Sequence, residues 1–218
     1  MTPPDVLAGL PVLFVMAAEP EYGPMLRRRI SPLMTGVGPV EAGVALAADL
    51  AARRAAGRLP GLVVSLGSAG SARLEQGSVH QIAAVGWRDI DASALGFPRG
   101  TVPFLDQPAE IPLPYRIPGL PAARLSTGAD VVSGAAYARI DADMVDMETY
   151  AHLRACQRFG VPLIGLRGVS DGAADLGGLS DWTALLGVID GRLAEAVDRL
   201  EAAIAAGLMQ TRHDFSRP

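Results

Sequence analysis

The chain of 218 residues is long enough for one hydrophobic core, so we expect a single domain over residues 1–218 with loose ends at 1–10 and 210–218. With 50% hydrophobic and 19% charged residues, the composition excludes an intrinsically disordered chain. The net charge of −4 excludes a protein that binds nucleic acid through a basic surface.

Apolar runs, taken in chain order, alternate between strand-like and helix-like patterns. Strands are predicted at residues 12–17, 30–34, 61–66, 79–87, 123–126 and 161–169. Helices are predicted at residues 20–29, 40–54, 149–159 and 182–205. This alternation indicates a three-layer α/β/α fold around a mixed, largely parallel twisted sheet. Residues 93–121 hold seven prolines without periodicity, which is typical of a functional loop.

Thiol and imidazole groups are sparse. Cys156 is the only cysteine, which excludes an intramolecular disulfide and predicts a reducing, cytoplasmic location. His80, His152 and His213 are far apart without ligand spacing, so we interpret them as structural or solvated rather than as a metal site. We expect no secretory signal, because no charged region precedes an apolar run at the N-terminus. We expect no membrane partner, because no apolar stretch reaches roughly 18 residues.

Polar residues gather where strands end. Arg167–Asp171 closes the strand at 161–169 with a carboxylate, and Ser65–Gly70 ends another strand. Val145–Glu148 is expected to open a helix. Ligands of open α/β sheets bind outside the carboxyl ends of strands. The sequence therefore predicts a ligand site formed by these three segments.

Taken alone, each motif has a structural alternative. Glu19, Glu21 and Glu148 are all placed where carboxylates usually complement a helix dipole. Ser68 with the residues after it could be an ordinary turn, and Met147 could belong to the core. What favours a site is that all of these motifs occur together at strand ends.

The glycines Gly36 and Gly38 follow a predicted strand, where a dinucleotide-binding loop would begin. The third glycine of that fingerprint is replaced by Glu41, so a nicotinamide site is rejected. Two readings stay open: a tight turn, or a backbone that approaches a small ligand closely.

Six motifs, in this order, carry a family resemblance: Ala-Ala-Glu-Pro-Glu, Thr-Gly-Val-Gly, Gly-Ser-Ala-Gly, Asp-x-Asp-Ala, Val-Asp-Met-Glu and Arg-Gly-Val-Ser-Asp. Together they resemble the nucleoside phosphorylase superfamily, and within it the 5′-methylthioadenosine/S-adenosylhomocysteine nucleosidases. The likeness runs from Val12 to Leu200. It implies a nucleoside phosphorylase-like fold, and hydrolysis of the N-ribosidic bond of 5′-modified adenine nucleosides with release of adenine.

The resemblance also implies residue roles. Asp171 would be the general acid that protonates N7 of the base, and Glu21 would activate the attacking water. Arg167 and Ser68 would hold that water and its carboxylate. Substrate contacts are implied for Glu148 at the ribose hydroxyls, Met147 against the sugar, Ser170 as the residue that positions Asp171, and Ala18, Gly70, Val131 and Val132 around the substrate. No cofactor and no metal are implied.

The sequence departs from the family pattern at three places. Val131 stands where an aromatic residue usually stacks on adenine, while the Val132 backbone should still bond the base edge. The segment between Glu21 and Gly36 is short, and Arg88 replaces a common histidine. These departures indicate a divergent member with a different 5′ substituent.

Apolar residues in the proline-rich loop predict a protein partner. The side chains of Phe97, Phe104, Leu105 and Tyr115 would be costly to leave in water, although the loop could instead fold back on its own domain. The resemblance implies a homodimer in which Leu95, Phe97 and Pro103 are inserted near the neighbour's 5′ pocket.

Two rival functions stay open. One is a phosphate-dependent purine nucleoside phosphorylase, including the adenosyl-hopane type, which would need an anion site. The other is a non-catalytic nucleoside-binding protein, for which Glu21 and Asp171 would be unnecessary.

Overall fold

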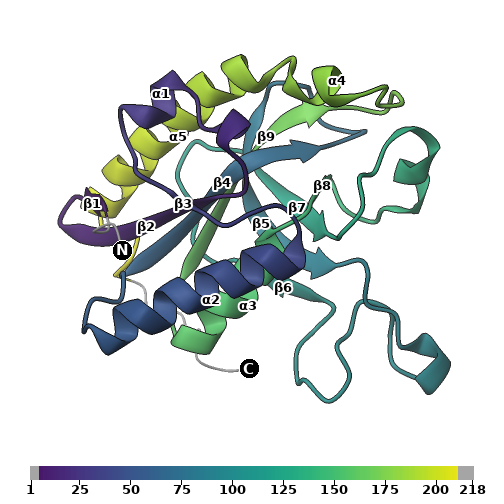
Figure 1. Ribbon diagram of the computed structural model, residues 1–218, viewed down its shortest axis with the longest axis horizontal. Coiled ribbons are helices and arrows are strands. Elements are labelled where there is room, and N and C mark those ends of the chain that lie inside the picture. Colours follow the sequence, from purple (N-terminus) through teal and green to yellow (C-terminus); the bar gives the residue numbers. More distant parts are fainter. Residues whose placement is uncertain (1–4, 211–218) are drawn as a thin grey trace.

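The computed structural model describes residues 5–210 (Figure 1). Its strands are β1 (Asp5–Leu7), β2 (Leu10–Met16), β3 (Leu33–Met34), β4 (Leu62–Gly70), β5 (Val79–Trp87), β6 (Glu110–Pro112), β7 (Ala122–Thr127), β8 (Met144–Asp146) and β9 (Leu163–Asp171). The α-helices are α1 (Pro24–Arg27), α2 (Pro39–Ala55), α3 (Thr149–Phe159), α4 (Leu179–Thr183) and α5 (Leu186–Ala205). Short 3₁₀ helices are η1 (Glu19–Glu21), η2 (Ser93–Leu95) and η3 (Gly134–Arg139).

Part of the sheet closes on itself. β4 pairs with β9 in parallel, β9 with β5 antiparallel, β5 with β7 and β7 with β8 in parallel, and β8 returns antiparallel to β4. Register shifts at Ala69/Gly70 in β4 and Ile82/Ala84 in β5 mark bulges, which increase the twist that closure needs.

A mixed sheet is therefore confirmed, but the prediction that it is largely parallel is not. Antiparallel pairs join β1 to β2, β5 to β6, β5 to β9 and β4 to β8. The simple three-layer arrangement is not confirmed either, because the central sheet curls into a closed ring. Sequence periodicity defines which residues are buried but not which strands pair, so this closure had no signal in the sequence.

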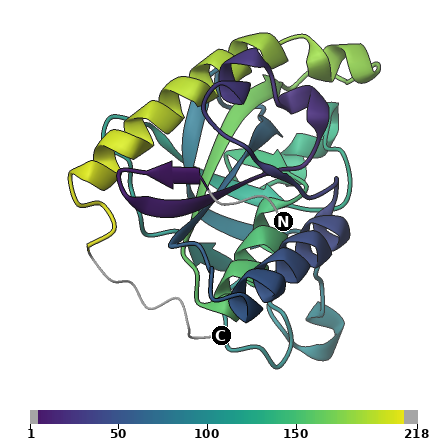
Figure 2. The same cartoon turned by 60° about the vertical axis from the view of Figure 1, so that its left-hand side comes forward.

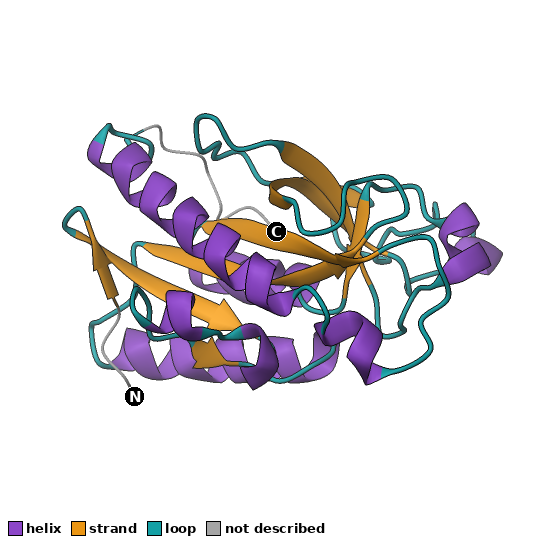
Figure 3. Cartoon of the chain, turned by 90° about the horizontal axis from the view of Figure 1, so that it is seen from above, coloured by secondary structure: helices purple, strands orange, loops and turns teal. Residues whose placement is uncertain are grey.

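Helices cover the sheet on two sides (Figures 1 and 3). The alternation along β4 produces both packing surfaces: Val64 and Leu66 join α5 in one core cluster, and Val63 joins α2 and α3 in the other. Figure 2 shows α5 lying along one side of the molecule and α2 with α3 along the other.

Several element predictions are corrected. Residues 5–10 are not loose, because β1 forms a hairpin with β2; residues 1–4 and 211–218 lie outside the described part. The expected helix at 20–29 is only η1 and α1, and the long C-terminal helix is divided into α4 and α5. Val145 and Asp146 lie in β8 rather than at the opening of a helix, whereas the helix predicted at 149–159 is confirmed as α3.

The proline-rich loop contains two short elements, η2 and β6. Within residues 5–210, no helix is long and apolar enough to cross a membrane.

Candidate functional site

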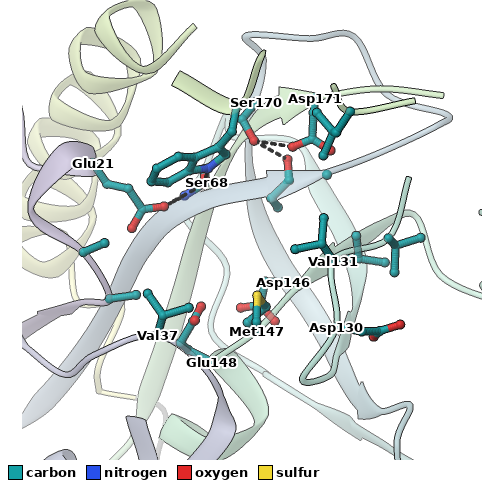
Figure 4. Close-up of a pocket in the computed structure, with 18 of the residues that line it drawn as sticks. Glu21, Val37, Ser68, Asp130, Val131, Asp146, Met147, Glu148, Ser170 and Asp171 are labelled. Atoms are coloured by element: carbon teal, nitrogen blue, oxygen red, sulfur yellow. Dashed lines mark hydrogen bonds between the residues drawn. The ribbon is translucent and has the colours of Figure 1, made fainter. Parts of the chain in front are cut away.

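A cavity of about 570 Å³ opens at the carboxyl ends of β2, β4 and β9. Its walls contain most of the predicted site residues (Figure 4): Ala18, Glu21, Ser68, Gly70, Val131, Val132, Met147, Glu148, Ser170 and Asp171. Figure 4 shows Glu21 and Glu148 on one side of this cavity, with Asp171 and Val131 across from them. Segments more than a hundred residues apart in the chain thus meet at one place.

The Glu21 carboxylate is fixed on one oxygen and free on the other. Its Oε1 accepts hydrogen bonds from the Ser68 backbone N–H at 2.7 Å and the Ser68 hydroxyl at 2.6 Å. Its buried Oε2 has no hydrogen-bond partner among the described residues. Burial raises the pKa of Glu21, against the opposing effects of Ser68 and of the Arg167 charge. A buried oxygen of this kind can accept a proton.

This geometry decides between the two readings of the early carboxylates. Glu21 ends η1 and points to Ser68, so it does not complement a helix dipole. Glu19, by contrast, pairs with Arg27 at 2.9 Å on the surface. The two acids of the same motif therefore have different roles.

Asp171 is held at both carboxylate oxygens. Ser170 donates its hydroxyl to Oδ1 at 2.6 Å, and the Tyr137 phenol donates to Oδ2 at 3.2 Å. A side chain at position 70 would collide with Tyr137 and Asp171, which explains the glycine there. Burial and the Asp171 charge raise the pKa of Tyr137, so its phenol stays a hydrogen-bond donor.

Glu148 precedes α3 without capping it, and its Oε1 accepts the Gly38 N–H at 2.9 Å. Burial and the nearby Asp146 charge raise the pKa of Glu148 to about 7. The glycine turn lets this amide approach, because Gly36 and Gly38 have φ of 83° and 94°. The turn thus orients a carboxylate in the cavity wall.

Replacing Glu148 with glutamine is expected to stabilise the fold in alkaline solution. Because the folded state binds the Glu148 proton more tightly than the unfolded state does, protonation of Glu148 stabilises the fold. This contribution is complete below about pH 4.5 and is lost as the pH rises through 7. Glu148→Gln removes that loss, so its unfolding free energy should exceed the wild-type value by up to ~3 kcal/mol at pH 8 and match it at pH 4. Chemical denaturation at both pH values measures this, with the exposed Glu201→Gln as control. A gain in unfolding free energy that is the same at both pH values would show that the effect does not come from the charge of Glu148.

Arg167 lies beneath the cavity rather than in it. Its guanidinium pairs with Asp146 at 3.0 Å and donates to Ser65 Oγ at 2.9 Å and Thr149 Oγ1 at 2.7 Å. No hydrogen bond joins Arg167 to the Glu21 carboxylate among the described residues, because the guanidinium is paired with the buried Asp146 carboxylate. The implied role of Arg167 in holding the water and its carboxylate stays a prediction.

His152 completes this buried network. Its Nδ1 lies 3.0 Å from Ser65 Oγ and its Nε2 lies 3.1 Å from Thr35 Oγ1. Burial lowers its pKa to about 3, so the ring is neutral. Because Ser65 accepts from Arg167, it can donate to Nδ1, which leaves the proton of His152 on Nε2. The structural interpretation of His152 is confirmed; His80 is also buried, and His213 lies outside the described residues.

The wall opposite Glu21 is more open. Val131 is 67% exposed although it lines the cavity, whereas Val132 is buried. Arg88 fixes this segment by bonding the Asp130 side chain and the carbonyls of Ser126 and Asp146. At the position where the resembled family usually has an aromatic residue, the cavity therefore has the aliphatic side chain of Val131, which is open to solvent.

Besides Arg167, three predicted residues are not in the cavity of this chain. Leu95, Phe97 and Pro103 lie on the protruding loop between β5 and β6, away from the cavity walls (Figure 1). Because the prediction concerns a neighbouring subunit's pocket, it stays a prediction.

Other cavity residues had no clear signal in the sequence. Trp182, Leu176 and Leu179 reach the cavity from α4 and the segment before it, and Val37 reaches it from the glycine turn. Trp182 was predicted only as the first residue of the long helix at 182–205. In residues 5–210, no group of three or more His, Cys, Asp or Glu residues is arranged to hold a metal ion.

Comparisons with known proteins agree with the predicted resemblance. Residues 122–206 match the model of the phosphorylase superfamily. A curated relative, the 5′-methylthioadenosine/S-adenosylhomocysteine nucleosidase of Actinobacillus succinogenes, is 27% identical over 166 residues, which cover 68% of this chain and 70% of the relative.

Solved structures share the fold at low identity. A mutant of futalosine hydrolase from Helicobacter pylori strain 26695 superposes with a TM-score of 0.73 at 19% identity, covering 87% of this chain and 97% of that one. The 5′-methylthioadenosine/S-adenosylhomocysteine nucleosidase of Colwellia psychrerythraea 34H, in complex with adenine, gives 0.72 at 20% identity, covering 88% and 94%. The resemblance is thereby confirmed, and the fold is nucleoside phosphorylase-like.

Proposed function

We propose that this chain is a nucleoside hydrolase of the phosphorylase superfamily. It cleaves the N-ribosidic bond of 5′-modified adenine nucleosides, such as methylthioadenosine or S-adenosylhomocysteine, and releases adenine. Support comes from the curated relative, whose name states this substrate pair, and from the neighbour that binds adenine. The cavity geometry supports the same reaction independently.

The observation that carries the proposal is the unpaired Oε2 of Glu21. A buried acceptor left without a partner costs roughly 1–3 kcal/mol, so it favours a bound donor. Water in the cavity is such a donor, and Ser68 keeps the other oxygen occupied. Glu21 would take a proton from this water as it attacks the sugar carbon.

Across the cavity, Asp171 would protonate the departing base. The Ser170 hydroxyl fixes one of its oxygens, which defines the direction of the carboxyl group. Glu148, whose pKa is raised to about 7, would accept hydrogen bonds from the ribose hydroxyls. An acid and a water-activating base on opposite sides of a sugar follow the logic of inverting hydrolysis.

The charge of the cavity favours water over phosphate. Carboxylates of Glu21, Asp130, Glu148 and Asp171 line it beside Asp146, whose charge Arg167 compensates from below, and among its described lining residues the one cation is Arg88. The Arg88 N–H groups are already directed to Asp130 and to backbone carbonyls. A phosphate would meet repulsion without a clamp, which argues against phosphorolysis.

The test is incubation with methylthioadenosine with and without inorganic phosphate, following adenine and the sugar product. Equal adenine release and a free sugar in both reactions support hydrolysis. Strict dependence on phosphate with a sugar 1-phosphate product would establish the phosphorylase. Tight binding without adenine release would instead favour the non-catalytic binding protein.

We also propose a homodimer that places the proline-rich loop at the neighbour's pocket. Leu95 is 77% exposed and Phe104 is 97% exposed, with Phe97 packed on Phe104 at 5.5 Å between ring centroids. Such an exposed apolar tip is costly in a monomer.

Phe97→Ala is accordingly expected to raise KM for 5′-modified substrates more than for adenosine, because the loop would contact only the 5′ group. Light scattering measures the dimer, and Val188→Ala, on the exposed side of α5, is the control. A fully active monomer at micromolar concentration would contradict the proposal, as would equal effects on both substrates.

A further inference from the structure

Trp182, a cavity residue in α4, is linked to Glu21 by a path of two hydrogen bonds through Ser68. Its indole Nε1 donates to Ser68 Oγ at 2.9 Å, and Ser68 Oγ donates to Glu21 Oε1 at 2.6 Å. The path runs from α4 through β4 to the end of η1. Figure 4 shows the last step, between Ser68 and Glu21.

The direction of this path follows from chemistry. An indole N–H can only donate, and an ionised carboxylate can only accept. A serine hydroxyl has one proton and can accept at its lone pairs. With Trp182 bonded to its oxygen, Ser68 has its single proton left for Glu21. The indole thus reinforces the rotamer in which the Ser68 hydroxyl donates to Glu21.

Trp182 belongs to a small element that also covers the cavity. α4 has only 5 residues and follows Gly177 and Gly178, so backbone propensity alone would not hold it in place. Trp182 packs against the core cluster below, while Leu179 is 73% exposed at the cavity rim. Docking of the indole is therefore a main contact that holds α4 over the cavity.

We propose that Trp182 is a positioning residue that commits the Ser68 proton to Glu21, so that docking of α4 and orientation of the base are coupled. The inference deepens the proposed function and rests on it for the role of Glu21 as base. Hydrogen bonds from Ser68 lower the pKa of Glu21 against burial, which raises it. Loss of the indole N–H should therefore raise the Glu21 pKa further.

The experiment measures Glu21 directly. Carboxyl ¹³C resonances of labelled glutamate are titrated by NMR, and Glu21→Gln assigns the signal. In Trp182→Phe, which keeps an aromatic ring but loses the donor, the Glu21 titration should move to higher pH. In a Ser68→Ala background the same substitution should not shift the Glu21 titration further, because the hydroxyl that links Trp182 to Glu21 is already absent. Trp87→Phe is the control, since Trp87 stacks on Tyr150 outside the cavity.

A kinetic readout accompanies the titration. The acidic limb of kcat should move in the same direction, with kcat about 2- to 10-fold lower near that limb, the effect of one hydrogen bond. If Trp182→Phe folds poorly, benzothienylalanine at position 182 keeps the two-ring shape and removes only the N–H.

Each outcome is decisive. An unchanged Glu21 titration, or a shift that persists in the Ser68→Ala background, would overturn the coupling. If the titration moves as expected but the wild-type protein hydrolyses no nucleoside, the coupling stands and the proposed function fails. The two proposals are therefore tested separately.

Discussion

Asp171→Asn is expected to slow adenine release by roughly 10²–10⁴-fold, the usual cost of losing a general acid. The amide has nearly the shape of the carboxyl group, so the partners Ser170 and Tyr137 can keep their positions. Affinity for a stable substrate analogue should stay within about tenfold, because the change removes a proton donor and no packing surface. Single-turnover kinetics and calorimetric titration measure the two quantities.

The exposed Asp141→Asn supplies a matched control with the same chemical change outside the cavity. It should leave both quantities at wild-type values. Near-normal turnover by Asp171→Asn would remove this carboxylate from the mechanism. Equal losses of turnover and analogue binding would indicate instead that Asp171 organises the cavity.

The sequence was sufficient to place Glu21 and Asp171 at the ends of apolar strands, where a ligand site is expected. β5 was predicted with its observed bounds, Val79–Trp87, from hydrophobic pattern alone. Asp171 and Ser68 both lie near the ends of such strands, β9 and β4, where parallel pairing brings them together. Strand ends carry a local signal, so these residues could be found without the fold.

What the sequence could not predict depends on contacts distant in the chain. Closure of the sheet needs β8 to pair with β4 through Gly70 and Val145, a three-residue strand with no periodic pattern of its own. Tyr137 reaches Asp171 from a 3₁₀ helix in a segment for which no element was predicted. Arg167 resembled a site residue, and only the fold shows that Asp146 takes its charge.

The ion pair of Arg167 and Asp146 forms the floor of the cavity and contributes strongly to the stability of the fold. Both side chains are almost fully buried, at 2% and 1% exposure. Asp146 also accepts the Thr127 hydroxyl at 2.6 Å and the Thr149 N–H at 2.9 Å. Although burial opposes ionisation, Arg167 and these hydrogen bonds lower the pKa of Asp146 overall. The wild-type pair therefore stabilises the fold above the unfolded-state pKa of that group and loses this effect in acid.

Arg167→Met should consequently destabilise the protein by about 3–5 kcal/mol at pH 8, since it leaves a buried carboxylate without its counter-charge. Without Arg167, burial dominates and the Asp146 pKa rises above its unfolded value, so the loss should shrink as the pH falls. Chemical denaturation at pH 8 and pH 5 measures both effects. The control is Arg29→Met, which breaks an exposed pair with Asp198 at 2.8 Å and should cost under about 1 kcal/mol at either pH. If Arg167→Met folds with wild-type stability but loses hydrolysis, Arg167 acts on the reacting water after all, and the floor of the cavity is catalytic rather than structural.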